Sequence, residues 1–429
     1  MQVNNRREKI PPFPHHKNFL YRIDKFFNPN SFFTQLSHGN FITVKEVIRG
    51  YKHKCAIPRV LLIDPTSSCN LRCKGCWAAD YAKGDSLSFE KLDDIINQSE
   101  KLGIMDIQLS GGEPLLRKDD ILRLCRKHRK TTFGVFTNAT LIDEEFADGI
   151  AEVGNLNMYV SIEGTREETD FRRGEGVHEK VLKAMSLLKE RNIGFAFSTC
   201  YHSKNYKTIA SDEFLDEMRD RGAWFGWLFN YVPVGKDADL SLVCTPEQRA
   251  WVREKIIDYC KRKNCLIIDF WNSGHTAYGC VAAGSGYLHI NAKGDVEPCA
   301  FCHYSDCNIH ELSLVEALRS PFLTSFRASQ PFSDNPLRAC PMIDVPEAIT
   351  DVINKGGAHS THYSEPEPIE VFVDKVNENA KKWEPVANEL KESLGEDKAK
   401  IYNTFVEFLN MRKRITDGRR KVSFDAEKD

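Results

Sequence analysis

The 429-residue chain has no long hydrophobic run: nowhere do about 18 apolar residues follow one another, the length that a membrane-spanning helix needs. Its basic start, MQVNNRREKI, continues into PPFPHH and not into the apolar segment of a signal peptide, so we expect a cytoplasmic protein. It also has no charge excess, because 59 Lys and Arg face 61 Asp and Glu and leave a formal net charge of −2. Such a balance gives no general attraction to nucleic acid, and we expect no nucleic-acid partner.

The composition is that of a folded protein, with 41% hydrophobic and 28% charged residues and no internal repeat or low-complexity tract. The length favours one large α/β unit with an appended module. The 14 cysteines are more than a reduced cytosolic chain needs for packing. Where they cluster, we expect metal ligands and not disulfides.

Residues 1–54 form a basic, aromatic N-terminal arm. Ten Lys or Arg against three Asp or Glu give this segment a local charge of +7, and seven phenylalanines lie within it: Phe13, Phe19, Phe26, Phe27, Phe32, Phe33 and Phe41. Basic amphipathic segments either pack their rings on the protein or touch lipid or an oily substrate. Periodicity does not separate packing on the next domain from peripheral membrane contact.

Residues 55–240 alternate short apolar runs with amphipathic stretches, which is typical of parallel strands joined by crossover helices. The expected strands are Val60 to Asp64, Ile104 to Leu109, Thr132 to Thr137, Leu156 to Ile162, Gly194 to Cys200 and Ala223 to Tyr231. The expected helices between them are Phe89 to Leu102, Asp119 to Lys130, Glu144 to Val153, Val177 to Arg191 and Asp212 to Arg221. Right-handed crossovers curl such a sheet, so we expect an α/β fold with a partial (β/α)6 TIM-like barrel.

Residues 241–345 are expected to form a small cysteine-rich α+β module. A helix from Pro246 to Lys263 leads into it, and a hairpin is predicted with strands Tyr287 to Ile290 and Val296 to Pro298 around the turn Asn291 to Asp295. Residues 346–429 are predicted to be a helical tail, in which Ile401, Phe405 and Phe408 share one helical face.

Polar segments follow four of the predicted strands. PTSSCNLRCKGCW comes after Asp64, SGGEP after Leu109, TNAT after Phe136 and EGTREETDFRRGEG after Ile162. In a barrel the carboxyl ends of parallel strands open at one mouth, where the chemistry takes place. We therefore expect these four segments to surround one site.

Cys69, Cys73 and Cys76 form a CxxxCxxC motif within eight residues. Three thiolates so close in the chain can bind one 4Fe-4S cluster and leave its fourth iron without a protein ligand. Structural zinc is an alternative, but no Cys or His follows Cys76 for tens of residues to complete a tetrahedron. A disulfide would leave one thiol unpaired, and chance clustering of packing cysteines is the last alternative.

The motif, with Trp77 after its last cysteine and its place after the first strand, resembles that of the radical S-adenosylmethionine (SAM) enzymes. The resemblance implies a 4Fe-4S cluster whose open iron binds the amino and carboxylate groups of S-adenosyl-L-methionine. It further implies that one electron, from a reduced donor such as ferredoxin or flavodoxin, cleaves the sulfonium to methionine and a 5′-deoxyadenosyl radical. That radical would abstract a hydrogen atom from a substrate.

Two further segments fit a cofactor site. Gly111 and Gly112 in SGGEP allow close backbone approach, and Glu113 offers a carboxylate to a cation. By resemblance these three residues bind the methionine ammonium, whereas the plain alternative is a tight turn with a solvated glutamate. Thr137 and Asn138 stand where the family contacts the ribose, although ordinary turn residues would look the same.

Ser161 and Glu163, at the end of the fourth strand, and Arg173 resemble the family's set that meets the ribose and the methionine carboxylate. A guanidinium fork suits two carboxylate oxygens. An exposed salt bridge is the alternative for Arg173, because Arg172 is adjacent and carboxylates lie nearby in the chain. Ser198, on the fifth strand, is a weaker candidate for the same site.

The second cysteine group comprises Cys280, Cys299, Cys302, Cys307 and Cys340. Its frame, GCVAAGSGYLHINAKGDVEPC followed by NIHELSLVEALRSPF and ACP, resembles the auxiliary-cluster extension called SPASM or, in its shorter form, twitch. By resemblance, Cys280, Cys299 and Cys340 match its cysteines. No cysteine follows Cys340, so we expect one auxiliary 4Fe-4S cluster; a zinc site and free core thiols are the alternatives.

The fourth auxiliary ligand stays open. Cys302 or Cys307 completes the site, or both are bystanders; His303 is a further candidate, with an ordinary surface or core histidine as its alternative. The scattered cysteines are interpreted as packing residues: Cys55, Cys125, Cys200, Cys244, Cys260 and Cys265. The aromatic residues of the last strand form either a dry wall around the radical or ordinary core: Trp224, Phe225, Trp227, Phe229 and Tyr231.

The sequence thus indicates a radical SAM enzyme that abstracts hydrogen from a peptide or protein, as is common among SPASM-containing maturases. The alternative substrate is a lipid or isoprenoid, favoured by the aromatic arm. A non-catalytic iron-sulfur or zinc redox sensor is the alternative of another class, but it has no use for SGGEP, TNAT and Arg173 at successive strand ends. A cobalamin-dependent methyltransferase is disfavoured because no DxHxxG-type corrinoid domain is present.

Overall fold

The computed structural model describes residues 44–79, 84–235, 238–277, 279–362 and 366–395. Most of the basic, aromatic arm, with its seven phenylalanines, lies outside the described residues. So does the predicted helical face of Ile401, Phe405 and Phe408.

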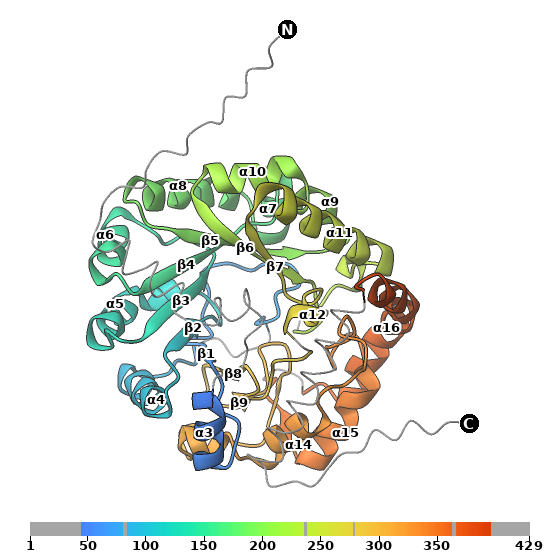
Figure 1. The fold of residues 1–429 in the computed structure, drawn as a ribbon. Helices are drawn as coiled ribbons and strands as arrows, with labels where there is room; N and C mark the ends of the chain where they lie inside the picture. Colours follow the sequence, from blue (N-terminus) through green and yellow to red (C-terminus); the bar gives the residue numbers. More distant parts are fainter. Residues whose placement is uncertain (1–43, 80–83, 236–237, 278, 363–365, 396–429) are drawn as a thin grey trace.

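The six predicted barrel strands are confirmed, each within two residues of its expected bounds. All neighbouring pairs among them run parallel and follow chain order, which is the topology of successive right-handed β-α units. Figure 1 shows these strands curving around the centre of the molecule. They are β1 (Val60–Ile63), β2 (Asp106–Leu109), β3 (Thr132–Thr137), β4 (Leu156–Ser161), β5 (Phe195–Tyr201) and β6 (Ala223–Asn230).

Helices cover the outer face of this curved sheet (Figure 1). Local signals explain their bounds: Ser88 caps the amide of Lys91 at the start of the first of them, and Gly103 ends it in the left-handed region with φ of 77°. The predicted helices are α4 (Phe89–Leu102), α5 (Lys118–Lys127), α6 (Glu144–Val153), α8 (Val177–Glu190) and α10 (Asp212–Asp220). A further helix, α7 (Arg166–Arg173), begins at the capping box of Thr165 and Glu168, in a polar segment for which the sequence predicted no helix.

The cysteine-rich module continues the barrel sheet. The predicted hairpin forms from β8 (Tyr287–Ile290) and β9 (Val296–Glu297), and β8 also pairs in parallel with β1, with Ile63 opposite Ile290. On the other edge, α11 (Pro246–Lys263) leads into β7 (Leu266–Asp269), which pairs with β6. The sequence predicted neither pairing. The resulting nine-stranded sheet has the order β7-β6-β5-β4-β3-β2-β1-β8-β9, so the module is anchored directly beside the first barrel strand.

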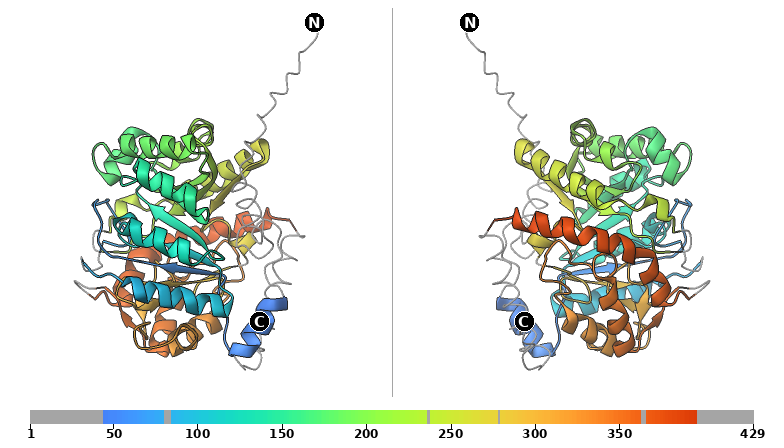
Figure 2. Two further views of the ribbon diagram at one scale, coloured as in Figure 1. Left: turned by 90° about the vertical axis from the view of Figure 1, so that its left-hand side faces the viewer. Right: turned by 90° about the vertical axis from the view of Figure 1, so that its right-hand side faces the viewer.

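The C-terminal segment supplies helices that close the module, as expected for part of the predicted tail. Figure 2 shows the long helix α16 (Ile369–Glu392) crossing one side of the molecule, where it contacts α11 and α15 (Pro346–Gly356). Trp383 anchors it, because its buried indole donates a hydrogen bond to the Leu337 carbonyl. The other elements are α3 (Val44–His53), η1 (Pro114–Arg117), α9 (Tyr206–Ile209), η2 (Leu240–Leu242), α12 (Gly274–Ala277), β10 (Tyr304–Ser305), α13 (Leu314–Ala317), α14 (Pro321–Ser329) and β11 (His359–Ser360).

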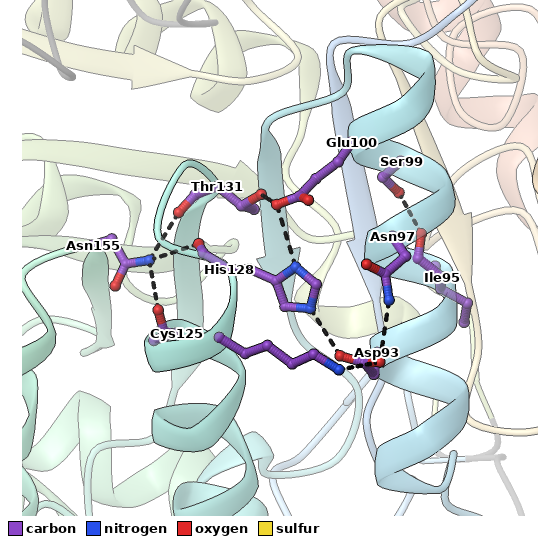
Figure 3. Close-up of polar contacts among 10 residues, drawn as sticks. Asp93, Ile95, Asn97, Ser99, Glu100, Cys125, His128, Thr131 and Asn155 are labelled. Atoms are coloured by element: carbon purple, nitrogen blue, oxygen red, sulfur yellow. Dashed lines mark hydrogen bonds and ion pairs between the residues drawn. The ribbon is translucent and has the colours of Figure 1, made fainter.

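A polar network fastens the amino ends of the strands, away from the mouth. His128, after α5, contacts Asp93 and Glu100 of α4 through its two ring nitrogens, at 2.9 and 3.2 Å (Figure 3). The side-chain amide of Asn155, at the start of β4, donates to three carbonyls, those of Cys125, His128 and Thr131. These contacts fix the turn between α5 and β3 to both neighbouring units.

Candidate active site

A cavity of about 230 Å³ opens at the carboxyl ends of the parallel strands, where the barrel prediction placed the site. The four polar segments that follow β1 to β4 all reach it, so the structure brings the predicted residues together. Among them, its lining includes Cys69, Cys73, Cys76, Gly111, Gly112, Glu113, Thr137, Asn138, Ser161, Arg173 and Ser198. Glu163 is fully buried beside this lining.

The loop with the three cysteines is held by contacts to other strand ends. Asn70 within it accepts a hydrogen bond from the Asn138 side chain at 2.9 Å. The amide of Lys74 donates to the carbonyl of Arg172 at 2.8 Å. The loop turns at Gly75, with φ of 61°, where a Cβ would lie 2.6 Å from the Tyr231 ring. All three thiols therefore face one cavity from a loop with little freedom.

The two glycines of SGGEP are required by close packing on this loop. The amide of Gly112 donates to the Thr66 carbonyl at 3.0 Å, and a Cβ at Gly112 would lie 2.1 Å from the Ser68 carbonyl oxygen. Gly111 has φ of 99°, and its Cβ would lie 2.7 Å from atoms of Asp64 and Thr66. No larger residue fits at either position without displacing backbone.

Glu113 is buried and not the solvated side chain of an ordinary turn, with 1% of its surface exposed. Its carboxylate accepts from the Thr137 hydroxyl at 2.6 Å and from the amides of Leu115 and Asn138 at 3.0 and 2.8 Å. Burial raises the pKa of Glu113, although these three donors favour the charged form. The donors orient a carboxylate at the cavity wall. Thr137 and Asn138, predicted to contact the nucleoside, here position Glu113 and the cysteine loop.

Glu163 forms a buried ion-pair group with two arginines of α7. Its Oε1 accepts from Arg172 Nη1 at 2.7 Å and Arg173 Nε at 2.8 Å, and its Oε2 accepts from the Cys200 amide. Burial opposes ionisation, but the two guanidinium groups outweigh it and lower the pKa of Glu163. The alternative of an exposed salt bridge is wrong, because Arg173 has 11% of its side chain exposed and Glu163 none. Glu163 therefore orients the two arginines at the cavity.

The last strands supply an aromatic wall. Trp227, Phe229 and Tyr231 line the cavity. Phe225 shares their face of the strand but lies nearer its amino end, where it packs in the core with Tyr159 and Ile268. Trp224 lies on the other face and is 38% exposed. The side chains near the carboxyl end thus form the wall, and Phe225 is ordinary core.

Two residues at the cavity were missed by the sequence analysis. Cys200 lines it at the end of β5, although we interpreted it as a packing residue, and Arg172 lines it beside Arg173. Ser198 points the same way two residues before Cys200, so the period of the strand could have identified the cysteine.

Four cysteines of the second group lie close together. Burial raises the pKa of the Cys280 thiol, and the charges of Cys340 and Cys299 raise it further. Cys302 is fully buried, and its pKa is also raised by burial and by the neighbouring thiols of Cys299, Cys340 and Cys280. Cys307 lies instead beside Asp306 and Ser320. Both ring nitrogens of His303 face protein atoms, the Ala300 carbonyl and His362, at 2.9 Å. The arrangement favours Cys302 over Cys307 or His303 as the fourth ligand.

A buried histidine joins the two sites. His289 of β8 lies 3.0 Å from Asp64 Oδ2 through Nε2 and 2.6 Å from Glu297 Oε2 through Nδ1. Burial alone would lower the pKa of His289, but the two carboxylates raise it to about 10. Asp64 precedes the first cysteine loop and Glu297 precedes Cys299, so this contact ties together the starts of the two loops.

The arrangement of the two cysteine groups suits iron-sulfur clusters better than single metal ions. In the described part of the chain, no three Cys, His, Asp or Glu side chains meet closely enough to hold one metal ion. The thiolates of a 4Fe-4S cluster each bind a different iron, so they need not converge on one point. The thiols of the second group belong to buried or half-buried residues, whereas those of the first line the open cavity.

Comparison with known proteins identifies both parts of the chain. The Radical SAM superfamily profile matches residues 63–215, and the SPASM iron-sulfur cluster-binding domain matches residues 280–341. None of the helices within the described residues is long and apolar enough to cross a bilayer.

Relatives with several activities align with this chain. It is 30% identical over 285 residues to an uncharacterised protein, MJ0907, of Methanocaldococcus jannaschii, covering 63% of this chain and 93% of that protein. It is 24% identical to an AdoMet-dependent heme synthase of Methanosarcina barkeri (59% and 80% covered) and 27% identical to the mycofactocin maturase MftC of Mycolicibacterium smegmatis (60% and 68% covered). A 33% identical match to an uncharacterised Archaeoglobus fulgidus protein spans only 34% of that protein.

Solved structures share the fold. Streptococcus suis SuiB bound to its precursor peptide SuiA aligns with a TM-score of 0.55 at 20% identity, covering 64% of this chain and 67% of SuiB. The anSMEcpe structure with bound AdoMet aligns with a TM-score of 0.53 at 17% identity, covering 78% of this chain and all of that one. These likenesses confirm the expected partial barrel with a cysteine-rich C-terminal module.

Proposed function

Since the chain belongs to the radical SAM superfamily and carries a C-terminal SPASM iron-sulfur domain, we propose that it is an enzyme that modifies a peptide or protein by abstracting a hydrogen atom. Its cofactors are those of the family: a catalytic 4Fe-4S cluster with S-adenosyl-L-methionine, and an auxiliary iron-sulfur cluster. When bound, the catalytic cluster supplies the electron that cleaves S-adenosyl-L-methionine to a 5′-deoxyadenosyl radical. The proposed electron donor is a reduced ferredoxin or flavodoxin.

The proposed ligands of the catalytic cluster are Cys69, Cys73 and Cys76, which face the cavity from one loop. The Glu113 carboxylate, oriented by three hydrogen bonds, accepts hydrogen bonds from the ammonium group of the methionine moiety. Arg173, held by Glu163, binds the methionine carboxylate. The proposed ribose contacts come from the polar side chains at the ends of β3, β4 and β5: Thr137, Asn138, Ser161 and Ser198.

The remaining cavity wall is apolar and aromatic. Trp227 and Phe229 stack with centroids 5.7 Å apart, and Phe136 packs edge-on against Phe229 at 5.8 Å. Such a wall offers few exchangeable hydrogens and keeps water from a radical. Its task in the proposed reaction is to exclude solvent while the substrate carbon is exposed to the nucleoside.

Two comparisons carry the choice of a peptide. The solved structure of SuiB, which shares the fold, holds its precursor peptide, and the relative MftC is a maturase. The cavity opens at the carboxyl ends of the strands, where a segment of a longer chain can reach it.

The first test is whether the protein cleaves S-adenosyl-L-methionine. Anaerobically reconstituted and dithionite-reduced protein is expected to release 5′-deoxyadenosine. Cys73→Ala should abolish the product, whereas Cys265→Ala, a half-buried cysteine outside the cavity, should leave it unchanged. A reduced protein with an intact cluster and no product would contradict the proposal and favour a redox sensor.

The second test addresses the substrate. The reduced enzyme is incubated with S-adenosyl-L-methionine and one of three uniformly deuterated pools: peptides from a protein digest, porphyrins, or isoprenoid lipids. Deuterium should appear in 5′-deoxyadenosine, read by mass spectrometry, with the peptide pool. Transfer from the porphyrin or the lipid pool, and none from peptides, would overturn the peptide assignment while leaving the radical chemistry intact.

A further inference from the structure

Arg172 connects helix α7 to the cysteine loop. Its side chain is 7% exposed, and its Nη1 donates to the fully buried Glu163 at 2.7 Å. Its carbonyl accepts from the amide of Lys74, which lies between the second and third cysteines of the motif. The residue is thus held from both sides, by its side chain and by its backbone.

The Nε–H group of Arg172 is a buried donor without an acceptor. Among the described residues, no hydrogen-bond partner lies within reach of this nitrogen, although Nη1 of the same side chain is paired. A buried unsatisfied donor typically costs about 1–3 kcal/mol, and more in a charged group. The acidic groups near this guanidinium, besides Glu163, are the thiols of Cys200, Cys73 and Cys76. Sulfur is a poor acceptor as a thiol, but it becomes a charged acceptor when it ligates iron as a thiolate.

Arg172 also shares its carboxylate partner. Arg172 and Arg173 both pair with Glu163, and a second buried carboxylate, that of Glu113, interacts with Arg173. His202 adds no charge, because burial lowers its pKa to about 4. The cysteine thiols lie near the Arg172 guanidinium as well, and they become anions when they ligate iron.

We propose that Arg172 is a positioning residue for the catalytic cluster: its charge and its Nε–H stabilise the cysteine thiolates and favour the reduced cluster. Arg173 is then left for the carboxylate of S-adenosyl-L-methionine. The inference rests on the proposed ligation by Cys69, Cys73 and Cys76. A cluster gains one negative charge on reduction, so a fixed positive charge and a donor to sulfur raise its reduction potential.

The test is the midpoint potential of the reconstituted enzyme, followed by electron paramagnetic resonance during a redox titration without S-adenosyl-L-methionine. The signal that changes when S-adenosyl-L-methionine is added afterwards identifies the catalytic cluster. Arg172→Gln should shift that midpoint to more negative potential with iron content near that of the parent. Arg172→Lys, which keeps the charge but lacks Nε–H, should give a smaller shift in the same direction.

The matched control is Arg191→Gln, which removes a guanidinium paired with Asp148 outside the cavity and should leave the midpoint unchanged. If Arg172→Gln does not retain iron, Arg172→Lys decides the question. A loaded Arg172→Gln or Arg172→Lys protein with the parental midpoint would overturn the proposal. Failure of the parent to make 5′-deoxyadenosine would instead contradict the proposed function, because the midpoint does not depend on turnover.

Discussion

The indole ring of Trp77 lies 6.0 Å from the ring of Phe301, centroid to centroid. Trp77 follows the last cysteine of the catalytic loop, and Phe301 stands between Cys299 and Cys302. Phe301 in turn packs edge-on against Trp271 at 4.9 Å, and the Trp271 side chain lies near the Cys340 thiol. A continuous aromatic contact therefore joins the two cysteine groups, which the parallel pairing of β1 and β8 places side by side.

This packing predicts which cysteines hold the auxiliary cluster. Cys340→Ala should lose about four iron atoms per protein, because it removes a thiol from the close group of four. Cys307→Ala should keep its iron, since that thiol lies beside Asp306 and Ser320. Iron and acid-labile sulfide analysis of anaerobically reconstituted protein checks both. Equal iron loss in the two variants would contradict the ligand set with Cys302.

The local parts of this arrangement were predictable. The strands and helices of the barrel are marked by the spacing of their apolar residues and by capping residues, so Ser88 and Gly103 mark the ends of α4 within the sequence itself. Because the strand ends could be located in this way, the motif segments could be placed after them. The pairing of β8 with β1 was not predictable, because more than 200 residues separate Ile63 from Ile290 and no local signal names the partner.

The charges of the site were also beyond the sequence. Arg172 and Arg173 are adjacent in the sequence. Both side chains reach Glu163 only because the helix α7 begins after Thr165 and fixes their directions. Likewise, the sequence does not show which of the five cysteines of the module lie close together in space. Only the folded module places Cys307 beside Asp306 and Ser320. Spacing identifies a motif, whereas long-range packing selects among its neighbours.

Gly112 is predicted to be irreplaceable at the contact between SGGEP and the cysteine loop. Gly112→Ala puts a Cβ 2.1 Å from the Ser68 carbonyl oxygen, so the two loops must separate. A loss of about 1.4 kcal/mol in binding corresponds to a roughly tenfold higher Kd for S-adenosyl-L-methionine, and we expect at least that effect. Equilibrium binding to the reconstituted protein measures it.

Gly154→Ala is the control for this variant. Its Cβ would meet nothing within 4 Å, but its φ of 70° makes alanine cost about 1–2 kcal/mol of stability. It should therefore lower stability and leave the Kd for S-adenosyl-L-methionine unchanged. A similar Kd change in both variants would mean that Gly112 acts through general destabilisation.

The His289 contact predicts a loss of stability at alkaline pH. His289 has its pKa raised to about 10 in the fold, whereas an unfolded histidine titrates near 6.5. A raised folded pKa stabilises fully below about pH 6.5, and the contribution is lost as pH rises toward 10. Thermal unfolding of the cluster-free protein should show this fall across pH 6.5–10.

His289→Gln should unfold at lower temperature near pH 6.5 and converge with the parent as the pH approaches 10. The comparison between the two proteins removes the contribution of other groups that titrate in this range. His310→Gln, at an exposed position, should follow the parent at every pH. A constant difference between His289→Gln and the parent across this range would refute the charged state of His289.

The two ends of β4 should separate stability from chemistry. Asn155 directly precedes the strand, is 3% exposed and donates to three carbonyls at the closed end of the barrel (Figure 3), whereas Ser161 ends the strand at the cavity. Asn155→Ala removes a donor that three carbonyls share and should lower the free energy of unfolding by about 1–3 kcal/mol. Iron content and the Kd for S-adenosyl-L-methionine should stay at parental values, because the chemistry of such a barrel takes place at the opposite, carboxyl ends of the strands. Asn157→Ala, which removes one hydrogen bond of 3.4 Å on the same strand, should cost less than about 1 kcal/mol. Loss of the cluster in folded Asn155→Ala would show that the two ends are coupled.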